Sequence, residues 1–407
     1  MKNLSKFQET TLGEIARKDR YGLVDGPFGS NLPASGYTSS GIPVIRGSNL
    51  SLGQERFRAR DDVFVSEETA NRLSRSLCHP DDIIFTKKGT LGQTGIVPRT
   101  EIYKTFLLSS NQMKLSVNTE IADPLFIYYY VSSPISRERI LREAMTTGVP
   151  KINLEYLRKF SISLPPLPIQ RKIAGILSAY DRLIENNTRR IEILEEMARS
   201  IYREWFVKFR FPGHEQAQMV DSELGLIPEG WEPVKVEDVV ELAYGKSLTA
   251  KNRIPGTVPV YGSAGVVGSH NESLVNAPGV IVGRKGNVGS VFWSNDDFFP
   301  IDTVFYVQTK VCLHYVYYNL QNQNFINNDA AVPGLNRNQA YSLPFLLPSE
   351  KLLKQFQHFV DTIFKQTSKL RIKNDNLRQT RDLLLPRLIS GEIDVENLDI
   401  NTGEIAA

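Results

Sequence analysis

The residues from Arg171 to Phe206 carry the pattern that most constrains this fold. Apolar side chains recur there in alternating steps of four and three, which is typical of a helix that packs along its whole length on another helix. The predicted pairing positions are Ile173, Leu177, Tyr180, Ile184, Ile191, Leu194 and Ile201, with Asn187 as a polar interruption. At ~1.5 Å per residue this helix would be roughly 50 Å long. A helix of that length needs a partner outside the core of one compact domain.

A second stretch, from Lys354 to Leu388, repeats the spacing after a shift of 183 positions, which takes Ile173 to Phe356. One set of its pairing positions is apolar: Phe356, Ile363, Leu370, Leu377 and Leu384. The other set is more polar and contains Thr367, Asn374 and Arg381. Polar residues on such a seam weaken pairing while fixing its register, so we expect looser pairing in the distal half of this helix. Pro386 should end or kink it near its C-terminal end.

The flanks of the two stretches repeat at the same offset. Val149-Pro150-Lys151-Ile152-Asn153 precedes the first, Val332-Pro333-Gly334-Leu335-Asn336 precedes the second, and Leu164-Pro165 corresponds to Leu347-Pro348. This agreement predicts tandem duplication of a globular unit followed by a long helix. It argues against the alternative of two unrelated amphipathic helices. Because the first helix leads away from the first unit, we expect the second helix to return antiparallel and to relate the units by a pseudo-twofold axis.

Both globular segments indicate a strand-rich fold with short elements and many turns. Residues 42–47, 82–86, 111–117, 160–164 and 279–282 are expected as strands, and residues 123–145 as helix interrupted at Pro134. The predicted fold class is α+β, with two tandem strand-rich mixed α/β domains separated by an antiparallel two-helix coiled coil. The predicted segments are a first domain (1–164), a first long helix (165–211), a linker (212–229), a second domain (230–347), a second long helix (348–391) and a tail (392–407).

Composition excludes several classes of protein. At 407 residues with 41% hydrophobic and 23% charged residues, the chain is expected to be soluble and to form two or three domains. The net charge of +3 permits a local nucleic-acid patch without requiring one. Two scattered cysteines, Cys78 and Cys312, do not make a disulfide framework or a zinc site. No signal peptide or membrane span is expected, so a cytoplasmic location is the default.

The sequence contains no recognisable catalytic motif. Gly245-Lys246-Ser247 resembles the end of a phosphate-binding loop, but that loop needs glycine where Val240 stands. The glycine spacing from Gly283 to Gly289 is wrong for a dinucleotide site. Neither a zinc-protease motif, nor a nucleophile-elbow serine, nor the Asn-Pro-Pro-Tyr motif of adenine methyltransferases is present. We therefore predict no catalytic and no metal-binding residues.

Two basic glycine turns fit contact with DNA better. Lys87-Lys88-Gly89 follows one predicted strand, and Arg284-Lys285-Gly286 follows the corresponding strand of the second segment. Their cations can meet phosphates while glycine permits close approach, although a plain hairpin with solvated lysines is the alternative. The candidate DNA-binding residues are Ser30, Asn31, Lys87, Lys88, Gly89, Lys246, Asn252, Arg253, Arg284, Lys285, Gly286 and Asn287. Phe28 and Trp231 are interpreted as apolar anchors within their units rather than as base-stacking residues.

Taken together, these pieces resemble the specificity subunit of type I restriction-modification enzymes over essentially the whole chain. The stretches that carry the resemblance are Gly26-Pro27-Phe28-Gly29-Ser30, residues 164–170, Trp205-Phe206, residues 227–231, Tyr244-Gly245-Lys246-Ser247, Arg284-Lys285-Gly286 and residues 384–393. The resemblance implies two target-recognition domains, each reading one half of a split site in double-stranded DNA. It also implies a helical spacer that acts as a ruler and docks modification (methyltransferase) subunits.

The same resemblance implies that the chemistry lies on other subunits. Modification subunits would carry S-adenosylmethionine and methylate adenine, and a separate restriction/translocase subunit would use ATP and Mg. This chain would then hold no cofactor of its own. Two other readings stay open: a paired-helix scaffold that assembles proteins without touching DNA, and a nuclease or methyltransferase with a degenerate centre. Salt-dependent duplex binding distinguishes the first from a DNA reader, and activity of the chain alone would support the second.

Overall fold

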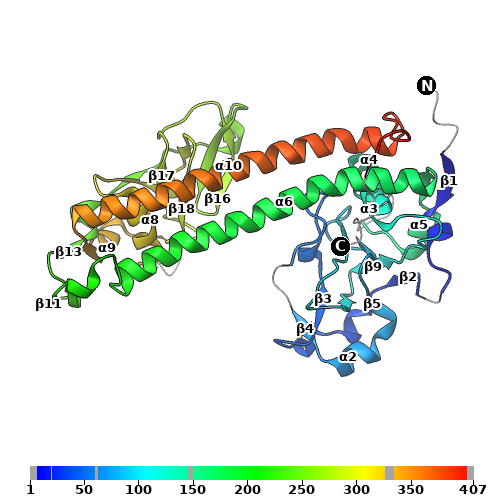
Figure 1. The fold of residues 1–407 in the computed structure, drawn as a ribbon, viewed down its shortest axis with the longest axis horizontal. Coiled ribbons are helices and arrows are strands. Elements are labelled where there is room, and N and C mark those ends of the chain that lie inside the picture. The colour runs from blue at the N-terminus through cyan, green and yellow to red at the C-terminus, as the bar shows by residue number, and fades with distance from the viewer. Residues whose placement is uncertain (1–6, 20, 60–62, 145–149, 326–333, 401–407) are drawn as a thin grey trace. The chain divides into compact units, whose positions relative to one another are not determined.

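The structure is a computed structural model that describes residues 7–19, 21–59, 63–144, 150–325 and 334–400 (Figure 1). The chain forms two compact units: unit 1 comprises Met1–Asn187 and Lys373–Ala407, and unit 2 comprises Thr188–Ile372. Each unit therefore contains one end of α6 (Leu167–Tyr202) and one end of α10 (Glu350–Ile389). This division differs from the predicted series of separate domains and helices, because the helix ends are buried in the two cores.

Unit 1 is built on two four-stranded sheets, with strand orders β2-β9-β6-β7 and β4-β3-β8-β5, and on a separate β1-β10 ladder. Its strands are β1 (Gln8–Thr11), β2 (Leu23–Asp25), β3 (Ile42–Ile45), β4 (Phe64–Val65), β5 (Leu77–Cys78), β6 (Ile83–Thr86), β7 (Thr94–Ile96), β8 (Phe106–Leu108), β9 (Gln112–Leu115) and β10 (Ser161–Leu164). Its shorter helices are α1 (Leu12–Ile15), α2 (Glu67–Arg72), α3 (Pro124–Ser132), α4 (Pro134–Ala144) and α5 (Leu154–Lys159). The expected interruption at Pro134 separates α3 from α4, and Met145 lies outside the described residues.

Unit 2 has sheets of order β14-β20-β17-β18 and β16-β15-β19, and the ladders β13-β21 and β11-β12. Its strands are β11 (Met219–Ser222), β12 (Gly225–Pro228), β13 (Glu232–Lys235), β14 (Glu241–Tyr244), β15 (Val258–Gly262), β16 (Gly265–His270), β17 (Gly279–Gly283), β18 (Val291–Ser294), β19 (Phe299–Pro300), β20 (Val304–Gln308) and β21 (Pro344–Leu347). Its shorter helices are α7 (Val236–Val239), α8 (Leu313–Gln321) and α9 (Arg337–Tyr341). The hairpin β11-β12 lies within residues 212–229, the segment predicted as a linker.

The two units repeat one topology. The antiparallel ladder β1-β10 corresponds to β13-β21, and the parallel pair β3-β8 corresponds to β15-β19. Asn153 caps α5 by accepting the N–H of Tyr156 at 2.8 Å, and Asn336 caps α9 by accepting the N–H of Asn338 at 2.9 Å. The asparagine of the repeated motif is therefore a helix N-cap in both copies. Val149, Val332 and Pro333 of that motif lie outside the described residues.

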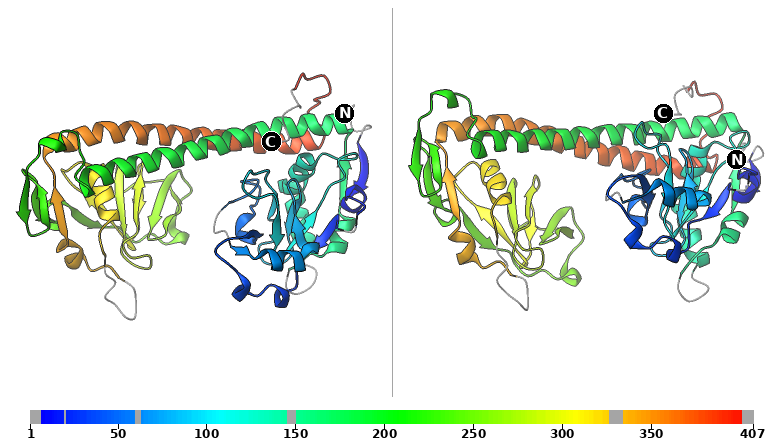
Figure 2. Two further views of the ribbon diagram at one scale, coloured as in Figure 1. Left: turned by 60° about the horizontal axis from the view of Figure 1, so that its bottom comes forward. Right: turned by 90° about the horizontal axis from the view of Figure 1, so that it is seen from below.

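Within each unit α6 and α10 run antiparallel and side by side (Figure 2). In unit 1 the Asn187 side chain donates to the Asn374 side chain at 2.9 Å. In unit 2 the ring centroids of Tyr202 on α6 and Phe356 on α10 lie 6.4 Å apart. The structure places all the predicted pairing positions in buried or half-buried environments. Pro386 lies in the last turn of α10, which ends at Ile389.

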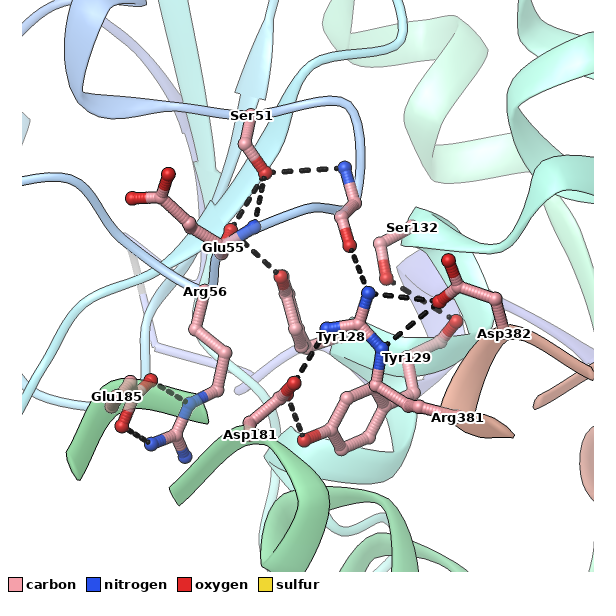
Figure 3. Close-up of polar contacts among 11 residues, drawn as sticks. Ser51, Glu55, Arg56, Tyr128, Tyr129, Ser132, Asp181, Glu185, Arg381 and Asp382 are labelled. Carbon is pink, nitrogen blue, oxygen red and sulfur yellow. Dashed lines mark hydrogen bonds and ion pairs between the residues drawn. The ribbon is translucent and has the colours of Figure 1, made fainter. Parts of the chain in front are cut away.

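The polar seam residues of unit 1 are buried with partners, so the expected loosening of the distal half of α10 was wrong. Arg381, 4% exposed, donates to Asp181 of α6 at 2.5 Å and to the carbonyl oxygen of Gly53 at 2.9 Å (Figure 3). The Tyr129 hydroxyl of α3 donates to the other carboxylate oxygen of Asp181 at 2.6 Å. This network, which we call the polar joint, connects both long helices to the globular part of unit 1. Asp181 is the partner that the heptad pattern did not identify.

Candidate nucleic-acid interface

One edge of the β2-β9-β6-β7 sheet carries the first basic turn. Because β2 and β6 are both antiparallel to β9, their C-terminal ends lie at the same edge. The Lys87 N–H donates to the carbonyl oxygen of Asn111 at 2.7 Å, and the Lys87 carbonyl accepts the N–H of Ile152 at 3.1 Å. The Lys87 ammonium lies 3.2 Å from the Asp25 carboxylate, at the end of β2. Through its backbone, Lys87 therefore connects two loops at this edge. Asp25 partly neutralises its side-chain charge.

The corresponding edge of the β14-β20-β17-β18 sheet carries the second basic turn. The Arg284 N–H donates to the carbonyl oxygen of Thr303 at 2.9 Å, and the Arg284 carbonyl accepts the N–H of Leu335 at 2.7 Å. Both turns then close in the same way: Leu91 N–H donates to the Gly89 carbonyl at 3.0 Å, and Val288 N–H to the Gly286 carbonyl at 2.9 Å. The two basic turns are thus copies in structure as well as in sequence.

Glycines allow the backbone to reach these conformations. Gly89 and Gly286 have φ angles of 105° and 82°, which side-chain-bearing residues rarely adopt. Gly26 and Gly245 open the loops that follow β2 and β14. A Cβ added to Gly26 would lie 2.0 Å from the carbonyl oxygen of Ser109, and one added to Gly245 would lie 2.1 Å from that of Ile301. Both loops therefore leave their sheets through a contact that only glycine permits.

The exposed charge of the first edge comes from two lysines. Lys88 and Lys151 are exposed and stand opposite each other in an antiparallel bridge, an arrangement that is destabilising for like charges. No carboxylate among the described residues forms an ion pair with either ammonium. A phosphate group would relieve this repulsion. Lys151 was missing from the predicted site residues, although its motif repeats at the helix offset and could have identified it.

At the second edge, two arginine side chains lie against the ring of Tyr244. The guanidinium carbons of Arg284 and Arg337 lie 5.3 and 4.9 Å from the ring centroid of Tyr244, which is 50% exposed. Arg284 also donates to the carbonyl oxygen of Asp302 from Nε at 3.1 Å and from Nη2 at 2.6 Å, which fixes its position. The candidate residues Lys285, Gly286, Asn287 and Lys246 are exposed at this edge. Sequence reasoning missed Arg337 and Tyr244.

The remaining candidates lie on matching turns. Ser30 and Asn31 are exposed in the 3₁₀ turn Gly29–Asn31, and Asn252 is exposed in the 3₁₀ turn Ala250–Asn252. Arg253 follows the second turn, but its Nη1 donates to the carbonyl oxygen of Val267 at 2.6 Å. That contact ties the loop to β16, so Arg253 has a role in the structure of the loop itself.

The two aromatic residues interpreted as anchors behave differently. Trp231 is 6% exposed and packs in the core of unit 2, with ring centroids 5.9 Å from Phe206 and 5.4 Å from Phe209. Phe28 is 79% exposed, so the interpretation of Phe28 as an anchor was wrong. The neighbouring Pro27 and Leu32 are buried in its place.

No group of three or more histidine, cysteine, aspartate or glutamate side chains among the described residues is arranged to hold a metal ion. Within the same residues, none of the helices combines the length and apolar character needed to cross a membrane.

Comparison with known proteins agrees with this arrangement. The family described as the type I restriction modification DNA specificity domain matches residues 6–196 and again residues 228–377. The MjaIX specificity subunit of Methanocaldococcus jannaschii is 22% identical over 437 residues, covering 97% of this chain and 98% of that protein. The MjaVIII specificity subunit of the same organism is 29% identical over 199 residues, and this match covers 49% of the chain but only 41% of that relative.

The fold is also shared with a solved structure. The type I restriction-modification S subunit from M. genitalium matches with a TM-score of 0.58 at 16% identity, covering 94% of this chain and 96% of that one. The family match covers most of both globular segments and much of the long helices. The chain therefore belongs to the type I restriction-modification specificity subunits.

Proposed function

We propose that this chain reads a bipartite site in double-stranded DNA, one half through each unit. The observation that carries the proposal is the basic turn, which recurs at the same sheet edge in both units with the same backbone hydrogen bonds. Lysine and arginine at such an edge supply phosphate contacts that position a protein on the duplex. The exposed polar residues Ser30, Asn31, Asn252 and Asn287 supply hydrogen-bonding groups for base edges.

We further propose that the chain is the non-catalytic member of its complex. Modification subunits would dock on it and bring S-adenosylmethionine, and a restriction/translocase subunit would bring ATP and Mg. The support for this division is the family membership together with the lack of catalytic motifs in the sequence. In this arrangement the long helices α6 and α10 would set the distance between the two half-sites.

The proposal is tested by measuring how duplex binding by the complex with its modification subunits depends on salt. Each phosphate contact contributes about 0.9 to the slope of log K against log salt. We expect Lys88→Ala and Lys285→Ala each to reduce that slope by about 1 and to weaken binding to all sequences similarly. Lys354→Ala is the matched control, because Lys354 is exposed on α10 and already pairs with Glu350 at 2.6 Å.

The same experiment separates DNA reading from the scaffold alternative. A complex that assembles but shows no salt-dependent binding of duplex would support a scaffold and refute the proposal. Sequencing of methylated bases in a host that carries the gene then gives the site itself. A motif of two specific halves separated by unspecified bases is the expected result.

A further inference from the structure

Phe28 is exposed in a way that the fold of unit 1 does not require. Its side chain is 79% exposed, while the residues on either side of its turn, Pro27 and Leu32, are buried. The turn is closed by two backbone hydrogen bonds, from Asn31 N–H to the Phe28 carbonyl at 2.8 Å and from Leu32 N–H to the Gly29 carbonyl at 3.2 Å. A fixed turn between two buried anchors thus presents an aromatic ring to solvent.

The loop that carries Phe28 is attached to the cationic edge of unit 1. Gly26 N–H donates to the carbonyl oxygen of Gln112 at 2.9 Å, and Asp25, one residue earlier, pairs with Lys87. At the other end of the turn, the Arg72 guanidinium of α2 donates to the Asn31 carbonyl at 3.3 Å. The loop of the exposed ring therefore has a basic residue at each end: Lys87, which follows β6, and Arg72, the last residue of α2.

We propose that Phe28 contacts a base directly in the half-site that unit 1 reads. This inference rests on the proposed function. A phenyl ring has no affinity for phosphate, but it can insert against a base step or pack on a thymine methyl group. The lysines and Arg72 supply the phosphate contacts that hold the duplex, and Ser30 and Asn31 supply hydrogen-bonding groups beside the ring. Phe28 is then a specificity-determining residue.

Unit 2 lacks this ring at the corresponding place. Its matching turn is closed by Asn252 N–H to the Thr249 carbonyl at 3.0 Å and Arg253 N–H to the Ala250 carbonyl at 3.4 Å. Thr249, at the position of Phe28, is exposed but carries a small polar side chain. The apolar base contact is therefore expected only in the half-site that unit 1 reads.

The test uses the complex with its modification subunits and compares Phe28→Ala with Ile102→Ala. Ile102 is the matched control because it is also 79% exposed and in unit 1, but it follows β7 at the opposite edge of the sheet. Exchange of residues 230–343 for the same segment of another family member first identifies the half-site of unit 2. Phe28→Ala should lower affinity for the specific duplex at least tenfold and relax the methylated motif only in the other half. Phe28→Leu should give an intermediate loss, and Ile102→Ala less than a twofold change.

Three results would overturn the inference. They are an unchanged motif with affinity within twofold, relaxation in both halves, and loss of modification-subunit binding with the motif intact. The last would make Phe28 a protein contact. Circular dichroism melting checks that each variant is folded, and an exposed side chain should leave the melting temperature unchanged. If the wild-type complex gives no bipartite motif, the proposed function itself fails. If the wild type gives a bipartite motif and Phe28→Ala leaves both the motif and the affinity unchanged, only the base contact of Phe28 is refuted.

Discussion

His314 should make unit 2 sensitive to mildly acidic pH. Its ring is 6% exposed on α8 and stacks on Trp293, with centroids 4.4 Å apart, while Phe364 packs edge-on at 4.5 Å. Burial lowers the pKa of His314 to about 4, and the Asp361 carboxylate, 3.4 Å from Nδ1, opposes this only in part. His314 Nε2 is buried and has no hydrogen-bond partner among the described residues. The folded unit therefore holds the neutral imidazole.

The size of the effect follows from the two pKa values. The ordinary pKa of 6.5 applies in the unfolded chain and a value of about 4 in the folded one. Because the folded pKa is depressed, protons bind the unfolded state more strongly, and stability present above pH 6.5 is lost as pH falls towards 4. The full difference corresponds to about 3.4 kcal/mol, of which about 2 kcal/mol is lost between pH 7 and pH 5.

Tryptophan fluorescence can measure this loss in unit 2 alone, because Trp205, Trp231 and Trp293 all lie within it. Urea unfolding of the wild type and of His314→Leu is compared at pH 7 and pH 5. Leucine is a suitable replacement, since Leu125 occupies the same second position of α3 in unit 1. The wild type should lose about 2 kcal/mol more than the variant. Equal losses in both proteins would show that His314 is not the titrating group.

Two other predictions concern the long helices. Asp181→Ala should destabilise unit 1 by about 3–5 kcal/mol, because it leaves Arg381 buried without its main charged partner. Thermal melting measures this, and a loss below about 1 kcal/mol would mean that the polar joint does not stabilise the fold. One heptad added within residues 171–206 should lengthen the spacer of the methylated motif and leave both half-sites unchanged. An unaltered spacer length in methylome sequencing would refute the proposal that the long helices set the distance between the half-sites.

The parts of the fold that the sequence predicted are those with a period or a repeat. The spacing of apolar residues from Ile173 onward identifies a paired helix because every turn of the helix repeats the same constraint. The duplication is visible because the N-capping asparagines Asn153 and Asn336 keep the same distance from the helices that follow. The basic turns were predictable for a similar reason: glycines with positive φ cannot be replaced freely, so Gly89 and Gly286 mark the same conformation twice.

The parts that the sequence did not predict depend on contacts between distant segments. Asp181 is one residue outside the heptad seam. The reason for a carboxylate at this position is its contact with Arg381 and Tyr129, which are distant in sequence. Lys151 is a candidate site residue because it lies opposite Lys88 in a bridge between segments far apart in the chain. Phe28 was misread because an aromatic residue is usually buried, and local sequence does not reveal that Pro27 and Leu32 take the buried positions.

The two units differ in the length of the connection that reaches the long helices. Residues 46–82 separate β3 from β6 in unit 1, whereas residues 263–278 separate the corresponding β15 from β17. The longer connection supplies Gly53, which accepts from Arg381, and Arg56, which donates to Glu185 at 2.9 Å (Figure 3). Arg381 can stay buried because this segment provides an acceptor that a shorter connection would not.

Unit 2 has apolar residues at the corresponding helix positions. With the offset of 183, Asp181 corresponds to Phe364 and Arg381 to Ala198, and Phe364 packs against Trp293 and His314. A buried ion pair requires every partner to be present, because losing one leaves an unpaired charge. Burial of the ion pair in unit 1 therefore depends on the longer connection, and exchanging residues 46–82 without also replacing Arg381 should destabilise that unit.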